Sequence, residues 1–175
     1  MMEFIGLQIA RVKFYGEKDK VQPLTNFFTG ARSMLVTLPV GYEDATIAGN
    51  ALREFRDRMS HLQLTVVNTS TRATSLIDFP KCEVIRINPA DLNRLSLPTQ
   101  SLLQRVLVRE YDVAIDLNLD FVLHSAYICK ASRAQVRVGF VHPAADIFFN
   151  VQFNSTSPRT PQSIYGSFAS CLGMF

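Results

Sequence analysis

The chain alternates short runs of β-branched and other apolar residues with longer segments whose apolar residues recur every three or four positions. The runs that predict buried strands are residues 34–38, 64–67, 84–87, 113–117 and 136–138. Segments with helical spacing, at 44–59, 102–107 and 121–130, lie between these runs. Short connections between such elements favour parallel strands joined by right-handed crossovers. The sequence therefore predicts an α/β protein with three α/β/α layers and a mainly parallel sheet.

A chain of 175 residues is long enough for one such domain. Residues 1–32 are less regular, and we interpret them as an N-terminal extension that packs its aromatic side chains on the core. Residues 33–175 are expected to form the single domain. Its last elements are a predicted strand at 147–153 and a closing helix that contains residues 164–172.

Composition excludes several classes of protein. With 47% hydrophobic and 19% charged residues, the chain is neither disordered nor membrane-spanning, and no apolar run approaches the roughly 20 residues of a transmembrane helix. The net charge of +3 is spread along the chain, so we do not expect nucleic-acid binding. Three widely spaced cysteines, Cys82, Cys129 and Cys171, form neither a metal knuckle nor a disulfide framework, which fits a reducing cytoplasm.

The loop after the first predicted strand, residues 39–44, lies where a dinucleotide-binding protein carries GxGxxG. Only Gly41 is present there, and no GK[ST] triplet occurs in the chain. We therefore expect no cofactor. Glu43 and Asp44 follow at the start of a predicted helix, where two interpretations stay open. Asp44 is either a general base that accepts a proton from a hydroxyl group, or a helix cap.

Further polar residues follow the other predicted strands. Thr69, Ser70, Thr71 and Arg72 come after the second strand, and Asp116, Asn118, Asp120 and His124 come after the fourth. Spacing places His124 one helical turn from Asp120, close enough for an ion pair, but a metal site needs more ligands than this pair. Arg133, Arg137 and His142 flank the last strand, where they either hold an anion or form a solvated face.

Five segments resemble the heptosyltransferase family of lipopolysaccharide synthesis, in order and spacing. Residues 34–44 resemble its opening strand and Gly-Asp loop, with Glu43 in place of the glycine and Asp44 at the aspartate. The eleven residues from Asp44 to Phe55 match the family's next helix, although Asn50 stands where that helix usually has proline. The strand at 64–67, the Tyr-Asp-x-x-Ile-Asp-Leu segment at 111–117 and the Arg-x-Gly-Phe segment at 137–140 are similar to its later motifs.

This resemblance implies a Rossmann-like fold and a position within a larger enzyme. The family joins two such domains: the first binds the sugar acceptor and supplies an aspartate base, and the second binds the nucleotide sugar. This chain has the length of one domain, so the resemblance implies an acceptor-side half without the donor-binding half. Asp44 is then the candidate base, and the candidate ligand-binding residues are Glu43, Thr69, Ser70, Thr71, Arg72, Asn118 and His142.

Three functions follow as alternatives. The first is a non-catalytic domain that binds a saccharide or a protein partner in the crevice at the strand ends. The second is half of a split glycosyltransferase, in which Asp44 acts as base and a separate domain supplies the donor. The third is a structural domain that forms a homodimer. The resemblance implies a bacterial protein in the cytoplasm, either free or at the surface of the inner membrane.

Overall fold

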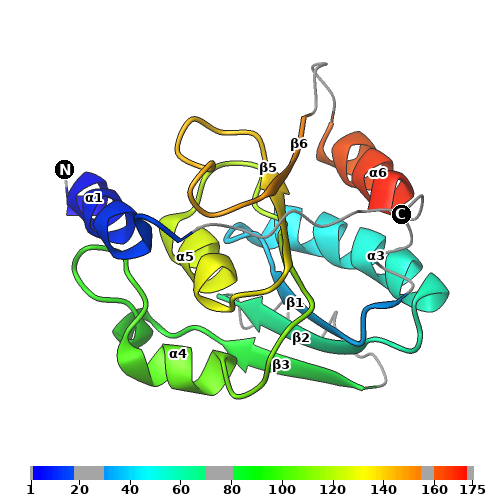
Figure 1. The fold of residues 1–175 in the computed structure, drawn as a ribbon. Helices are drawn as coiled ribbons and strands as arrows, with labels where there is room; N and C mark the ends of the chain where they lie inside the picture. Colours follow the sequence, from blue (N-terminus) through cyan, green and yellow to red (C-terminus); the bar gives the residue numbers. More distant parts are fainter. Residues whose placement is uncertain (1, 18–29, 70–80, 155–159, 173–175) are drawn as a thin grey trace.

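The protein forms one open sheet of six parallel strands in the order β3-β2-β1-β4-β5-β6 (Figure 1). The computed structural model describes residues 2–17, 30–69, 81–154 and 160–172. The strands are β1 (Ser33–Thr37), β2 (Gln63–Asn68), β3 (Cys82–Arg86), β4 (Val113–Asp116), β5 (Val136–Phe140) and β6 (Val151–Phe153). The predicted fold class, a Rossmann-like α/β domain with a parallel sheet, is thus confirmed.

The strand order reverses direction between β1 and β4. From β1 the chain proceeds outward through β2 to β3, then crosses back to β4 on the other side of β1 and continues to β5 and β6. Such a switch point leaves a crevice at the carboxyl ends of the two central strands, where open α/β proteins bind ligands. Here the register pairs Thr37, the last residue of β1, with Asp116, the last residue of β4.

Helices cover both faces of the sheet, which gives the three predicted layers (Figure 1). One face carries α3 and α6, and the other carries α1, α4 and α5. Their bounds are α1 (Met2–Phe14), α3 (Tyr42–Arg58), α4 (Gln100–Val106), α5 (Leu123–Ala131) and α6 (Pro161–Leu172). Strand residues alternate between the two cores: Met34 and Val36 face α3 and α6, whereas Leu35 faces the opposite layer.

Helix α1 lies in a segment for which the sequence predicts no regular structure, yet it packs closely against the rest of the domain. It buries Gly6, Ala10 and Phe14, which recur every four residues along one face. A Cβ atom built on Gly6 would lie 2.2 Å from the carbonyl oxygen of Leu95, so only glycine allows this approach. The Phe14 ring lies 5.0 Å from the Tyr127 ring of α5. The described part of the extension is therefore joined to the layer of α4 and α5.

Some sequence-based boundaries need correction. The predicted strand at 147–153 is confirmed only for its last three residues, because residues 143–148 form turns. Phe149 precedes that short strand and lies against Gly139 of β5, where a Cβ atom would come within 2.6 Å of the ring. The side chain of Thr99 caps α4, so this helix begins at Gln100, two residues before the predicted segment at 102–107. A short helix predicted to reach residue 77, and the aromatic residues 27 and 28, lie outside the described residues.

Within the described part of the chain, no helix combines the length and the hydropathy needed to cross a membrane.

Candidate functional site at the carboxyl edge of the sheet

The candidate residues come from four different strand ends. Because all six strands are parallel, the segments that follow β1, β2, β4 and β5 emerge at the same edge of the sheet. This edge carries Asp44, Thr69, Asn118 and His142 in the described residues. They do not form one cluster: Asp44, Thr69 and Asn118 follow the neighbouring strands β1, β2 and β4 around the switch point, whereas His142 lines a groove beside α1.

A buried chain of hydrogen bonds connects the carboxyl ends of β1 and β4. Three donors converge on Oδ1 of Asp116: the Thr37 hydroxyl at 2.9 Å, the Asn118 backbone N–H at 3.0 Å and Asn118 Nδ2 at 2.6 Å. Oδ1 of Asn118 then accepts from the backbone N–H of Val40 at 3.1 Å. The Asn118 side chain thus donates through its nitrogen to Asp116 and accepts through its oxygen from Val40, so the orientation of its amide group is fixed. The end of β4 therefore holds the loop that leads from β1 into α3.

Burial raises the pKa of Asp116 to about 6, and the hydrogen bonds from Asn118 and Thr37 oppose that rise. Desolvation is thus the dominant influence on this carboxyl, which is only 4% exposed. Its bonds are all directed into the fold. Asp116 therefore positions the loop and does not present its carboxylate to a ligand.

Asp44 belongs to the first turn of α3, together with Glu43. The N-cap of this helix is Gly41, so the interpretation of Asp44 as the cap residue is wrong. A Cβ atom built on Gly41 would lie 3.7 Å from Asp44 Oδ2, which places the carboxylate over the start of the helix. Among the described residues it has neither a hydrogen-bond donor nor an ion-pair partner. Asp44 is half-buried and Glu43 is exposed, so both carboxylates can accept hydrogen bonds from the hydroxyl groups of a ligand.

Tyr165 joins α6 to the segment that follows β4. Its hydroxyl is buried and donates to the carbonyl oxygen of Leu117 at 2.7 Å. Burial and the negative charges of Asp44, Asp116 and Asp120 raise the pKa of this hydroxyl. Three carboxylates are therefore close enough to the Tyr165 hydroxyl to affect its pKa. The spacing of these residues in the sequence did not indicate this proximity.

Thr69 follows β2 at the same edge, and its hydroxyl oxygen is buried without a hydrogen-bond partner within the described ranges. Such a hydroxyl usually has a partner, so it is a reasonable contact for a ligand or an ordered water. Ser70, Thr71 and Arg72, which were predicted to bind ligand with it, lie outside the described residues.

His142 lies instead in an open groove of about 450 Å³ between α1 and the loops after β4 and β5. The groove is lined by Glu3, Phe4, Leu7, Asp120, Phe121, Leu123, His142 and Ala144. The imidazole stacks on Phe121 with ring centroids 5.0 Å apart, and its Nδ1 accepts from the Ala144 N–H at 3.1 Å. In the neutral ring the proton is then on Nε2, which can donate to a ligand. The sequence named His142 but not the α1 residues beside it, because they are distant in the chain.

Two predictions for basic side chains are wrong. His124 does not pair with Asp120, because α5 begins only at Leu123 and Nε2 of His124 is buried without a partner among the described residues. Burial lowers the pKa of this imidazole to about 4, so it is neutral. Arg137 is only 4% exposed and donates to the carbonyl oxygens of Phe148 and Ala134, so it forms no solvated face.

No group of three or more His, Cys, Asp or Glu side chains that could hold a metal ion occurs in the parts of the chain that the structure covers.

Comparison with known proteins relates this arrangement to glycosyltransferases at the level of fold. No protein-family model and no curated protein sequence matches the chain. The structure of E. coli heptosyltransferase WaaC with ADP superposes with a TM-score of 0.60 and 12% identity, over 79% of this chain and 46% of that one. The structure of WaaC with ADP-2-deoxy-2-fluoro heptose superposes with a TM-score of 0.61 and 13% identity, over 79% of this chain and 47% of that one.

A third solved structure, the family 9 glycosyl transferase from Veillonella parvula, has a TM-score of 0.61 and 17% identity over 82% of this chain and 42% of its own. The chain thus spans less than half the length of each of these structures. The likeness establishes a shared fold, similar to one portion of a family 9 glycosyltransferase.

Proposed function

We propose that this chain is a heptosyltransferase-like acceptor-side domain that binds a saccharide-type ligand at the carboxyl edge of its sheet and does not transfer sugar by itself. The observation that carries the proposal is the hydrogen-bonded chain from Asp116 through Asn118 to Val40. It fixes the loop beside Asp44 at the switch point, and a binding site needs such preorganised backbone.

The polar groups at this edge suit a polyhydroxylated ligand. Glu43 and Asp44 offer carboxylate acceptors to sugar hydroxyls, and the Thr69 hydroxyl offers both a donor and an acceptor. Arg72, predicted beside them, would add a cation. The resemblance to enzymes of lipopolysaccharide synthesis supports a saccharide of that bacterial pathway as the ligand. A protein partner at the same edge is the remaining alternative.

Ligand titration tests this proposal. Neutral heptoses, hexoses and short oligosaccharides are titrated into the purified chain, and unfolding is followed by thermal shift. A ligand at one hundred times its Kd adds about 2.7 kcal/mol of stability. Asp44→Asn should weaken binding, whereas Asp57→Asn, at an exposed position near the other end of α3, should leave binding unchanged. The absence of binding by every saccharide, or equal binding by the two variants, contradicts the proposal.

A split glycosyltransferase is a second candidate, favoured by the half-buried Asp44 carboxylate that lacks a hydrogen bond from any described residue. In this case Asp44 accepts the proton of an acceptor hydroxyl while a separate domain holds the nucleotide sugar. Transfer would then appear only when the donor-binding domain is added, and it would be lost in Asp44→Asn. Turnover by the isolated chain with a nucleotide sugar would contradict both this candidate and the non-catalytic proposal.

A homodimer is the third candidate, and the outer side of α1 favours it. This helix and the residue that follows it expose the large apolar side chains of Met2, Phe4, Ile5, Ile9, Val12 and Tyr15. Apolar surface of this kind often marks an interface. Sedimentation of the wild type and of Val12→Ser tests the idea, and a monomer at high concentration in both cases rejects it.

A further inference from the structure

A second groove lies between α1, α4 and α5, apart from the residues assigned to the carboxyl edge. It has a volume of about 390 Å³. Its lining comprises Lys13, Phe14, Glu17, Gln100, Leu103, Gln104, Leu107, Lys130, Ala131 and Arg133. Helix α5 follows β4 and returns along the sheet, so its last residues, 130 and 131, lie toward the amino ends of the strands. None of these residues belongs to the proposed saccharide site.

The charged side chains of this groove are unequal in sign: three cations, Lys13, Lys130 and Arg133, accompany the single carboxylate of Glu17. Lys130 is only 4% exposed, although it carries a charge. Its Nζ lies 3.8 Å from Glu17 Oε2, which is the long limit of an ion pair, and the Glu17 side chain is 45% exposed. Lys130 therefore adds a buried positive charge to the lining of the groove.

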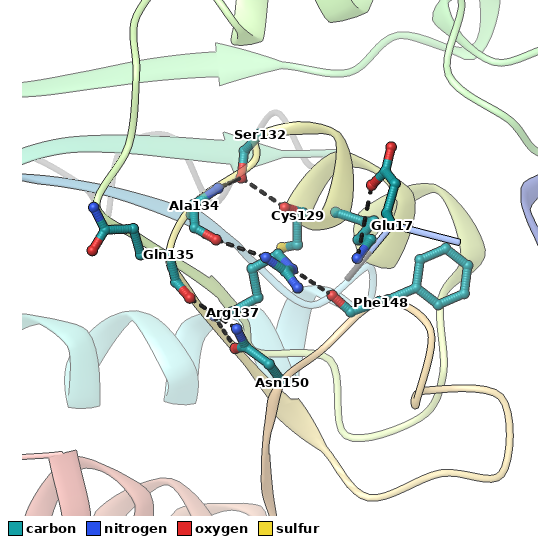
Figure 2. Close-up of polar contacts among 9 residues, drawn as sticks. Glu17, Cys129, Ser132, Ala134, Gln135, Arg137, Phe148 and Asn150 are labelled. Atoms are coloured by element: carbon teal, nitrogen blue, oxygen red, sulfur yellow. Dashed lines mark hydrogen bonds and ion pairs between the residues drawn. The ribbon is translucent and has the colours of Figure 1, made fainter. Parts of the chain in front are cut away.

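The side chains of Lys13 and Arg137 are held in place by contacts with the fold. Lys13 Nζ donates a hydrogen bond to the Tyr127 hydroxyl and lies 4.9 Å from the centre of that ring. Arg133 has a φ of 56°, in the left-handed region, just after the end of α5. The Arg137 guanidinium lies between the carbonyl oxygens of Ala134 and Phe148, and it adds a buried positive charge near the end of α5 (Figure 2).

The helix dipole accounts for only part of this arrangement. Cations near the C-terminus of a helix gain about 0.3–1 kcal/mol, which can explain Lys130 and Arg133 at the end of α5. Lys13, however, belongs to α1, and the amides of Gln100 and Gln104 come from α4. Three separate helices thus direct donors toward one hollow whose remaining surface is apolar, with Phe14 and Leu107 among its residues.

We propose that this groove binds a small molecule through a phosphate or another multiply charged oxyanion, with the apolar part of the ligand against Phe14 and Leu107. The cations supply the charge, and the amides of α4 supply neutral donors at the rim. Such a site would respond to a phosphorylated or polycarboxylate metabolite. It does not depend on the saccharide proposal, because it shares no residue with Asp44 and its neighbours.

Titration of the full chain with inorganic phosphate, pyrophosphate and citrate, followed by amide NMR at constant ionic strength, tests the proposal. We expect saturable shifts at residues 13, 104, 130 and 133, and little effect of chloride. Stronger binding of pyrophosphate than of citrate identifies a phosphate site, and the reverse identifies a carboxylate site. Shifts that do not saturate, or that chloride reproduces, overturn the proposal.

Gln104→Glu places a carboxylate at the rim without changing the core, because Gln104 is exposed. Repulsion between this charge and a dianion should weaken binding by about tenfold. Gln162→Glu is the matched control, since Gln162 is an exposed helical residue of α6 on the other side of the sheet, and its affinity should equal that of the wild type. Equal affinity of all three proteins contradicts the proposed site. Lys130→Met should also lose binding, and if that variant does not fold, Gln104→Glu decides alone.

Discussion

The side-chain oxygen of Asn118 accepts a hydrogen bond from the backbone N–H of Val40 at 3.1 Å, and so connects the end of β4 to the loop after β1. These residues are 78 positions apart in the chain. The same amide donates to the buried carboxyl of Asp116. One side chain therefore joins the two central strands to the loop that carries the candidate site.

Replacement of Asn118 tests this connection. Asn118→Leu removes one donor and one acceptor from a buried network, so the Val40 N–H and Asp116 each lose a partner. We expect the free energy of unfolding to fall by about 1–3 kcal/mol, measured by urea denaturation. Saccharide affinity should fall as well, because the loop is no longer held. Asn50→Ala, at an exposed position of α3, should change stability by less than about 0.5 kcal/mol.

The pH dependence of stability should carry the signature of Asp116. Its pKa is raised from 3.8 to about 6 in the fold, so between these values the native state binds more protons than the unfolded state. Stability therefore decreases as the pH rises through this range, and the loss persists above it. Asp116→Asn removes this loss, and its stability relative to wild type should rise by about 3 kcal/mol between pH 4 and 7. A constant difference across this range would show that Asp116 titrates normally.

His124 should produce the opposite slope in nearly the same range. Burial lowers its pKa from 6.5 to about 4, so the unfolded state binds more protons between these values. Stability is complete above pH 6.5 and falls as the pH decreases toward 4. His124→Leu removes this fall, and urea denaturation at several pH values should show the variant gaining on the wild type as the solution becomes acidic. His61→Gln, at an exposed position, should follow the wild-type curve.

The approach of α1 to its neighbours depends on Gly6. Gly6→Ala places a methyl group 2.2 Å from the Leu95 carbonyl oxygen, so the helix must shift. We expect a loss of about 1–3 kcal/mol and faster proteolysis within residues 2–17. Gly49→Ala is the matched control, because no atom of the described residues, apart from its chain neighbours and the backbone of its own helix, lies within 4 Å of its added methyl group, and alanine favours the helix. That variant should be as stable as the wild type or more so, and equal losses in both variants would reject the steric explanation.

Much of the fold could be predicted because the relevant signals are local. The runs around Val36, Val66 and Ile115 are strongly apolar, and each is followed by polar residues, so the strands and their order along the chain were clear. Helix α1 was missed because its outward side is also apolar, with Ile5, Ile9 and Val12 exposed, which removes the contrast that indicates an amphipathic helix.

The candidate site was only partly predictable. The sequence identified Asp44, Asn118 and His142 as polar residues after buried strands, but it left open a capping role for Asp44, whereas the N-cap is Gly41. It paired His124 with Asp120, although Asp120 precedes the helix. These errors arise because spacing along a chain does not state where a helix begins.

The sequence by itself determined that this protein builds a parallel α/β domain, since apolar periodicity and turn residues act over a few neighbouring positions. Only the tertiary structure decided what the polar residues do. It directed Asp116 and Arg137 into the fold, left Asp44 without a described hydrogen bond, and brought cations from α1 and α5 to one groove. Burial and partnership depend on residues far apart in the chain, and no local pattern contains that information.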